Sequence, residues 1–200
     1  MKRIVAMLLC LTAALTFSAC NSDDSSSETS EAETEEATKE TEIVYEVDTT
    51  EAQETSVTLS DGVLETSYYT VEFGDDWSLT TGSDELILLA GITDSSMSIS
   101  AVYSSDYAGL SSDEFAESFK VQYDEVEGYD VLSSEVQTLG ENEVGTLVVS
   151  MTISESTDTQ KQYFIADETG GVIITYLSSA DTFDDSVTAI DDAISTFAFK

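Results

Sequence analysis

One cysteine, Cys20, separates a short leader from the part of the chain that can fold. The leader begins with the basic residues Lys2 and Arg3, continues with an apolar stretch over residues 4–17, and ends with two small residues before Cys20. This order is typical of a secretory signal peptide that is cut from the mature protein. The apolar stretch is shorter than the about 20 residues that a membrane-spanning helix needs, so a permanent span is the weaker interpretation. We therefore predict that residues 1–19 are removed and that Cys20 becomes the first residue.

The residues before Cys20 also predict a lipid anchor. Phe17-Ser18-Ala19-Cys20 resembles the lipobox of bacterial lipoproteins, although Phe17 stands where a branched aliphatic residue is usual. The resemblance implies that Cys20 carries acyl chains such as palmitate, and two or more chains anchor a protein stably to a membrane. An ordinary secretory signal with an incidental cysteine is the alternative. If Cys20 is acylated, the protein lies outside the cytoplasm on the cell membrane. A long acidic stretch follows Cys20, so we favour the outer face of a single-membrane bacterium.

The charge and the missing residue types argue against several functions. The sequence has 41 acidic and six basic residues, a formal net charge of −35, and no histidine. This charge would repel a phosphate backbone, so we expect no nucleic-acid partner. Without histidine there is no Ser–His or Cys–His relay and no imidazole ligand for a metal. Cys10 leaves with the leader, so Cys20 has no partner for an internal disulfide. We expect a protein that is not an enzyme and needs no cofactor.

Residues 20–56 have the composition of a tether. They are rich in Ser, Thr, Ala and Glu and contain neither glycine nor hydrophobic periodicity. Low hydrophobicity combined with like charge cannot offset the entropy of ordering, so this stretch is predicted to be disordered and extended. Ile43–Val47 is an exception with the composition of a strand. It could form a short edge strand or a pairing site for a partner.

Residues 57–200 have the size and patterning of a single α+β domain. Two segments have helical spacing. Ser111 and Glu114 form a capping-box pattern ahead of Phe115, and a second apolar stripe begins near Asp181. Hairpin-length connections between the strands predict a mostly antiparallel sheet with at least two packed helices. Strands are predicted by alternating or continuous apolar residues in segments 67–73, 85–90, 96–103, 129–139, 144–154, 160–166 and 172–178.

The first and the last segments of the domain resemble those of the PsbP-like family. Residues 69–77, an aromatic-rich strand and turn followed by Trp77, are similar to the family's opening, and residues 183–200 are similar to its closing helix and terminal strand. The chain has no proline, so Gly74 to Asp76 must form the turn that relatives make with proline. The resemblance implies an α/β/α sandwich around an antiparallel sheet. It also implies an assembly or interaction module with no catalytic residues to carry over.

Carboxylates are the main candidates for a metal site. Oxygen ligands are what Ca²⁺ requires. None of the acidic clusters has the spacing of a calcium-binding loop, so a solvated acidic surface is the simpler interpretation. The metal candidates are Asp75, Asp76, Asp181, Asp184 and Asp185.

Three aromatic residues are candidates for a binding surface. Trp77 follows a turn and could be an exposed anchor, or it could close the end of the core. Tyr68 and Tyr103 could line an outer face of the sheet, since tyrosine is common at interfaces. Half-buried tyrosines are equally ordinary in an antiparallel sheet.

Two functions follow from these observations. The first is a non-catalytic interaction module, held to the membrane through lipidated Cys20, that binds another envelope protein or a cell-wall component. This function predicts an apolar or aromatic patch bordered by acidic residues. The alternative is an envelope lipoprotein that binds a small ligand or Ca²⁺ through surface carboxylates. This alternative predicts carboxylates that converge in a pocket.

Overall fold

The computed structural model describes residues 57–153 and 156–200. These residues belong to one compact unit, Ala52–Lys200. The predicted leader (residues 1–19), the acylation site at Cys20, the tether (residues 20–56) and the segment Ile43–Val47 lie outside the described residues. Neither helix in the described part of the chain is long and apolar enough to cross a bilayer.

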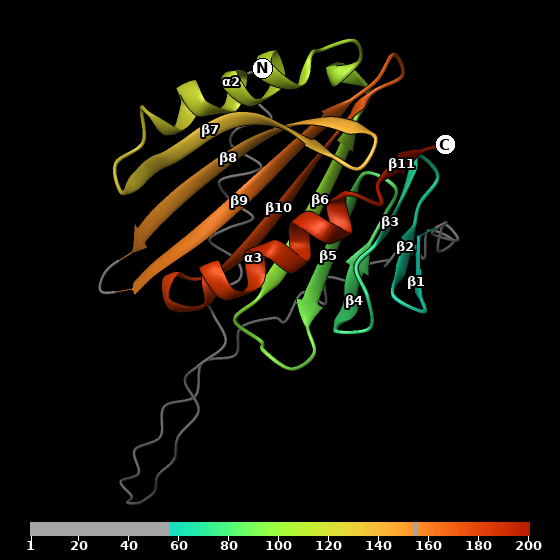
Figure 1. Cartoon of the computed structure of the whole chain (residues 1–200), viewed down its shortest axis with the longest axis horizontal. Helices are drawn as coiled ribbons and strands as arrows, with labels where there is room; N and C mark the ends of the chain where they lie inside the picture. The colour runs from blue at the N-terminus through green and yellow to red at the C-terminus, as the bar shows by residue number, and fades with distance from the viewer. Residues whose placement is uncertain (1–56, 154–155) are drawn as a thin grey trace, which may run out of the picture. The chain divides into compact units, whose positions relative to one another are not determined.

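A large antiparallel sheet forms the centre of the domain (Figure 1). It contains six of the seven predicted strands, all but the one predicted over residues 67–73, and it adds one that the pattern missed, β4, in which only Trp77 is buried. Its seven strands lie in the spatial order β4 (Trp77–Gly82), β5 (Leu86–Gly91), β6 (Ser98–Ser104), β10 (Gly171–Ser179), β9 (Ser156–Ala166), β8 (Asn142–Ile153) and β7 (Tyr129–Leu139).

The two helices pack on opposite faces of this sheet. Successive side chains of a strand point to opposite faces of the sheet, so two adjacent residues of β9 contact different helices. Phe164 contacts Phe115 of α2 (Ser112–Tyr123), with ring centroids 5.2 Å apart. The next residue toward the N-terminus, Tyr163, donates a hydrogen bond of 2.8 Å to Asp191 of α3 (Ala180–Ile194). The predicted α/β/α sandwich with an antiparallel sheet is confirmed.

Both helices begin where the sequence predicts. Ser111 caps α2: its hydroxyl accepts a hydrogen bond from the Glu114 backbone, and the Glu114 carboxylate accepts one from the Ser111 backbone. This reciprocal capping box satisfies two donors that the first helical turn leaves unpaired. α3 buries Phe183, Ile190 and Ile194, which lie on one stripe at intervals of two turns and one turn.

A second, smaller sheet lies beside the first (Figure 1). The strand predicted over residues 67–73 is its β3 (Tyr69–Glu72), and the terminal strand that the resemblance implies is its β11 (Ala198–Phe199), but their union with two further strands in a separate sheet was not predicted. Its strands have two to four residues, and the two that no pattern predicted have three each, too few for an alternation to be recognised. They nonetheless supply Leu64, Tyr69 and Val71 to the hydrophobic core. The spatial order is β1 (Thr58–Ser60), β2 (Val63–Glu65), β3 (Tyr69–Glu72) and β11 (Ala198–Phe199). Pairing of β11 with β3 brings the C-terminal residues beside the turn between β2 and β3.

Candidate functional site

Two of the predicted binding residues, Tyr68 and Tyr103, form a stacked pair where the two sheets meet. Their ring centroids lie 3.8 Å apart and the ring planes differ by 8°. Tyr68 directly precedes β3 of the small sheet, whereas Tyr103 lies on β6 of the large sheet. The Tyr68 side chain is exposed, with 37% of the residue's surface accessible. We call this pair the Tyr68–Tyr103 patch.

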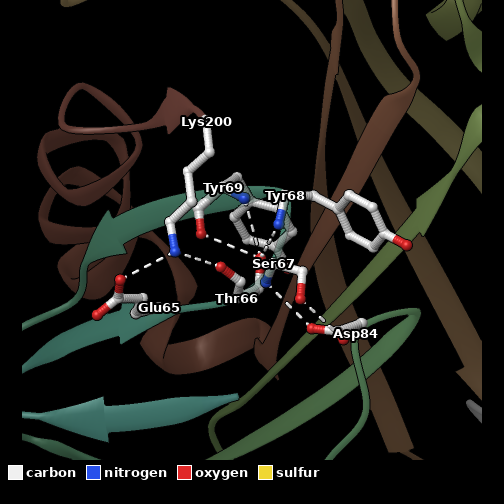
Figure 2. Close-up of polar contacts among 7 residues, drawn as sticks. All are labelled: Glu65, Thr66, Ser67, Tyr68, Tyr69, Asp84 and Lys200. Carbon is white, nitrogen blue, oxygen red and sulfur yellow. Dashed lines mark hydrogen bonds and ion pairs between the residues drawn. The ribbon is translucent and has the colours of Figure 1, made fainter. Parts of the chain in front are cut away.

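The turn that presents Tyr68 is held by a buried threonine (Figure 2). Thr66 Oγ1 accepts hydrogen bonds from the backbone N–H groups of Tyr68, at 3.0 Å, and Tyr69, at 2.9 Å. The same hydroxyl donates to the carbonyl oxygen of Tyr69 at 3.0 Å. Thr66 is 1% exposed, so water does not compete for these bonds. One side chain therefore fixes the backbone on both sides of Tyr68.

Two segments that are distant in sequence make hydrogen bonds to the same turn (Figure 2). Ser67 donates from its backbone N–H and its hydroxyl to the two carboxylate oxygens of Asp84, each at 3.0 Å. The C-terminal residue, Lys200, donates its backbone N–H to the Tyr68 carbonyl at 2.9 Å. Its ammonium group bonds the Thr66 carbonyl oxygen and lies 2.9 Å from Glu65 Oε1. Tyr68 is thus presented by a turn that is already ordered before any partner arrives.

Tyr103 is held by the turn between β9 and β10. Its hydroxyl donates to the Thr169 carbonyl oxygen at 3.3 Å. The Asp167 carboxylate accepts three hydrogen bonds within this turn, from the backbone and hydroxyl of Thr169 and from the backbone of Gly170. Partial burial favours the neutral acid, but these hydrogen bonds prevail and lower the pKa of Asp167. The charged carboxylate therefore orders the turn against which Tyr103 rests.

The segments that hold the Tyr68–Tyr103 patch carry acidic residues. Asp84 bonds the residue before Tyr68, and the exposed Glu85 accepts the Tyr103 backbone N–H on its carbonyl oxygen at 3.0 Å. The exposed Glu168 directly precedes Thr169. Each lysine in residues 57–153 and 156–200 is in an ion pair. Lys120 pairs with Glu117 and Asp124, Lys161 with Asp191, and Lys200 with Glu65.

The third aromatic candidate, Trp77, lies in the core. It is 8% exposed, and its ring contacts Phe73 at 6.5 Å and Tyr176 at 6.3 Å between centroids. The ring is therefore not an exposed anchor, and the alternative interpretation, that Trp77 closes one end of the core, describes its position.

The carboxylate candidates do not converge. Asp75 and Asp76 are exposed in the turn before β4, and Asp181, Asp184 and Asp185 are exposed on α3. Within the described ranges, no three carboxylate, thiol or imidazole groups lie close enough together to hold a metal ion.

A buried polar cluster between the large sheet and α3 was missed in the sequence. Lys161, with a side chain 7% exposed, lies 2.6 Å from Asp191 Oδ1, which also accepts the Tyr163 hydroxyl. Burial, followed by the negative charge of Asp191, raises the pKa of Tyr163. The sequence feature that could have predicted this cluster is a lysine, Lys161, within the run of buried residues on β9. Lys161 and Tyr163 on β9 both bond Asp191 on α3, so each residue of the cluster has a partner across the contact between helix and sheet. We therefore assign the cluster a structural role.

The fold and this site define an antiparallel α/β/α sandwich that carries a preordered aromatic patch. No protein-family model and no curated protein matches the sequence. Solved structures are similar in fold. A protein from Bacteroides thetaiotaomicron superposes with a TM-score of 0.53 and 9% identity over 74% of this chain. This chain spans about half of that protein, 49% of its length.

Two further solved structures resemble the chain at lower TM-scores. One is the cyanobacterial PsbP (CyanoP) of Synechocystis sp. PCC 6803, with a TM-score of 0.49, 14% identity and coverage of 75% of this chain and 96% of that one. The other is LpqN of Mycobacterium tuberculosis, described as involved in cell envelope biogenesis, with a TM-score of 0.49, 13% identity and coverage of 75% and 87%. At these identities the likenesses concern the fold and do not extend to function.

Proposed function

We propose that this chain is a lipid-anchored, extracytoplasmic interaction module without catalytic activity. Acylated Cys20 is its anchor, and residues 20–56 hold a PsbP-like domain away from the membrane surface. The domain binds another envelope protein or a cell-wall component through the Tyr68–Tyr103 patch. The signal-peptide pattern supports the location, and the order of strands and helices supports the family.

The observation that carries the proposed binding function is the preordered, exposed ring of Tyr68. A partner that packs on a fixed side chain does not have to restrict its rotation, so less of the binding free energy is lost to ordering. Tyrosine is enriched at interfaces because its ring provides a large apolar area and its hydroxyl can still bond water or a partner. The rival function, cation binding by converging carboxylates, has no supporting geometry among the described residues.

Photo-cross-linking in the native envelope tests the proposed binding. A photoreactive phenylalanine replaces Tyr68 in the full chain, and a matched variant carries it at Leu132, which is 60% exposed on the edge strand β7. We expect a discrete cross-linked product from position 68 that is absent from position 132. Excess wild-type chain should compete the product away, and Tyr68→Ala at the same concentration should compete less effectively. Equal products from both positions, or equal competition by both chains, would contradict the proposal.

Mass spectrometry of the N-terminal peptide tests the anchor separately. We expect the mature chain to begin at Cys20 with acyl chains attached, and a Cys10→Ala variant to be processed in the same way. A mature chain that begins elsewhere, or an unmodified thiol at Cys20, would refute the anchor and leave the binding surface to be judged by cross-linking.

A further inference from the structure

The chemistry of the partner can be inferred from the charge around the Tyr68–Tyr103 patch. Asp84, Glu85 and Glu168 lie on the segments that hold the two rings, and the chain as a whole carries a formal charge of −35. Lys200, the lysine that bonds this turn, is held in an ion pair with Glu65. The lysines of the described residues therefore leave most of the acidic charge unbalanced.

The face of the Tyr68 ring is itself attractive to a cation. An aromatic ring has a negative face, and Lys or Arg groups bind over it at distances of about 6 Å or less from the ring centre. Tyr103 lies against one face of the Tyr68 ring, and 37% of the Tyr68 surface remains exposed to an incoming group. The one cation–ring contact found among the described residues lies elsewhere, between Lys161 and Tyr163 at 5.1 Å.

We propose that the Tyr68–Tyr103 patch receives an arginine or lysine side chain from a basic segment of a partner protein. The cationic group lies over the exposed face of Tyr68, and the neighbouring carboxylates provide charge complementarity. Arginine is the better fit, because its planar guanidinium can stack on the ring and donate hydrogen bonds to carboxylates at the same time. This inference rests on the proposed binding function and adds the chemical class of the partner.

Matched peptide probes test the inference on the full chain in detergent micelles. The first probe is a short Gly/Ser peptide with one central arginine. The second has citrulline, a neutral group of nearly the same shape, in place of the arginine. We expect the arginine peptide to shift the amide NMR signals of Tyr68 and Tyr103, and added salt to weaken this binding because the attraction is electrostatic. The citrulline peptide should leave both signals in place.

Three variants separate the ring from the general acidity of the surface. Tyr68→Ala should weaken binding of the arginine peptide by about two- to fivefold, the contribution expected of an exposed cation–ring contact. Tyr68→Phe should retain wild-type affinity. Asp113→Asn removes one exposed carboxylate from α2, on the opposite face of the large sheet, and should also retain it.

Two outcomes would overturn the inference. Equal binding of the citrulline peptide at Tyr68 would show that the patch does not select a cation, while a cross-link from position 68 would still support the interaction module. Unchanged affinity in Tyr68→Ala would show that the peptide binds the acidic surface in general. Loss of the envelope cross-link would instead refute the proposed function, so the two failures can be told apart.

Discussion

Lys161 Nζ lies 2.6 Å from Asp191 Oδ1 at the contact between β9 and α3. The Tyr163 hydroxyl donates to the same oxygen at 2.8 Å, so one carboxylate serves two buried donors. Taking a charged pair out of water is costly, and such a pair adds little net stability compared with apolar residues that pack equally well. Removing one partner is far more harmful, because the other charge is left without compensation.

Asp191→Ala should therefore destabilise the domain strongly. The substitution leaves the ammonium of Lys161 and the hydroxyl of Tyr163 without their acceptor, and we expect a loss of about 3 kcal/mol in the free energy of unfolding. Chemical denaturation measures this loss, with Asp192→Ala as the control because Asp192 is the exposed neighbour on the same helix. A double variant, Lys161→Met with Asp191→Leu, should recover part of the stability, because no charge is left buried without a partner, although the Tyr163 hydroxyl still lacks its acceptor. Equal losses in Asp191→Ala and Asp192→Ala would show that the ion pair is unimportant.

Ser111→Ala tests the capping box of α2. The serine hydroxyl accepts the Glu114 backbone N–H, and losing such a cap costs about 1 kcal/mol. Ser118→Ala is the matched control, since Ser118 lies within the same helix and its hydroxyl bonds only the Phe115 carbonyl oxygen. Alanine favours a helix interior, so this control should be neutral or slightly stabilising. Denaturation midpoints that fall equally in both variants would argue against the cap.

The other half of the capping box should make stability depend on pH. Hydrogen bonds from the Ser111 side chain and backbone lower the pKa of Glu114 below its ordinary value of 4.5. Because the folded pKa is lower than the unfolded one, the stabilisation is fully present above pH 4.5 and is lost as the pH falls through the folded pKa. Glu114→Ala should thus melt below wild type at neutral pH, and the gap should narrow in acid. A gap that is constant with pH would mean that the charge of Glu114 plays no part.

Fluorescence can verify the position of Trp77, the single tryptophan of the chain. A ring that is 8% exposed and packed against Phe73 and Tyr176 should emit at short wavelength and resist quenching by acrylamide. Unfolding in denaturant should shift the emission to longer wavelength, because the ring then meets water. Efficient quenching of the native protein would place Trp77 at the surface.

Regular patterns made much of the fold predictable from the sequence. Residues 129–139 match β7 at both ends, and the predicted strands of β8, β9 and β10 differ from the observed ones by a few residues. Ser111 with Glu114 marked the start of α2, because both halves of a capping box lie within one helical turn. By contrast, β4 buries only Trp77 and has exposed or half-buried residues along the rest of its length. No alternating pattern therefore predicted this strand.

The residues of the candidate site could be predicted from the sequence, but their arrangement in space could not. Tyr68 and Tyr103 were identified from their residue type, but their stacking depends on two sheets meeting, and no local pattern encodes that contact. The hydrogen bonds from Lys200 to the turn that holds Tyr68 depend likewise on the pairing of β11 with β3. For Asp75 and Asp184, closeness in sequence to other carboxylates gave no information on whether the groups share a site, and they lie exposed on separate elements.

Gly140, in the turn between β7 and β8, should be a position at which any side chain destabilises the domain. Its φ of +63° is unfavourable for other residues, and an added Cβ would overlap the carbonyl oxygen of Ser195 at the end of α3. Gly109 is the matched control, because its φ of +73° is similar and its missing Cβ would meet open space. Gly109→Ala should cost about 1–2 kcal/mol from the backbone conformation alone.

Gly140→Ala should lose a further about 1–3 kcal/mol, because the hairpin and the end of α3 must move apart. Denaturant midpoints of the two variants measure the difference, and a near-UV circular dichroism spectrum checks that Gly140→Ala is still folded. Equal losses in both variants would mean that the hairpin adapts without cost and that the close contact with Ser195 does not restrict this turn.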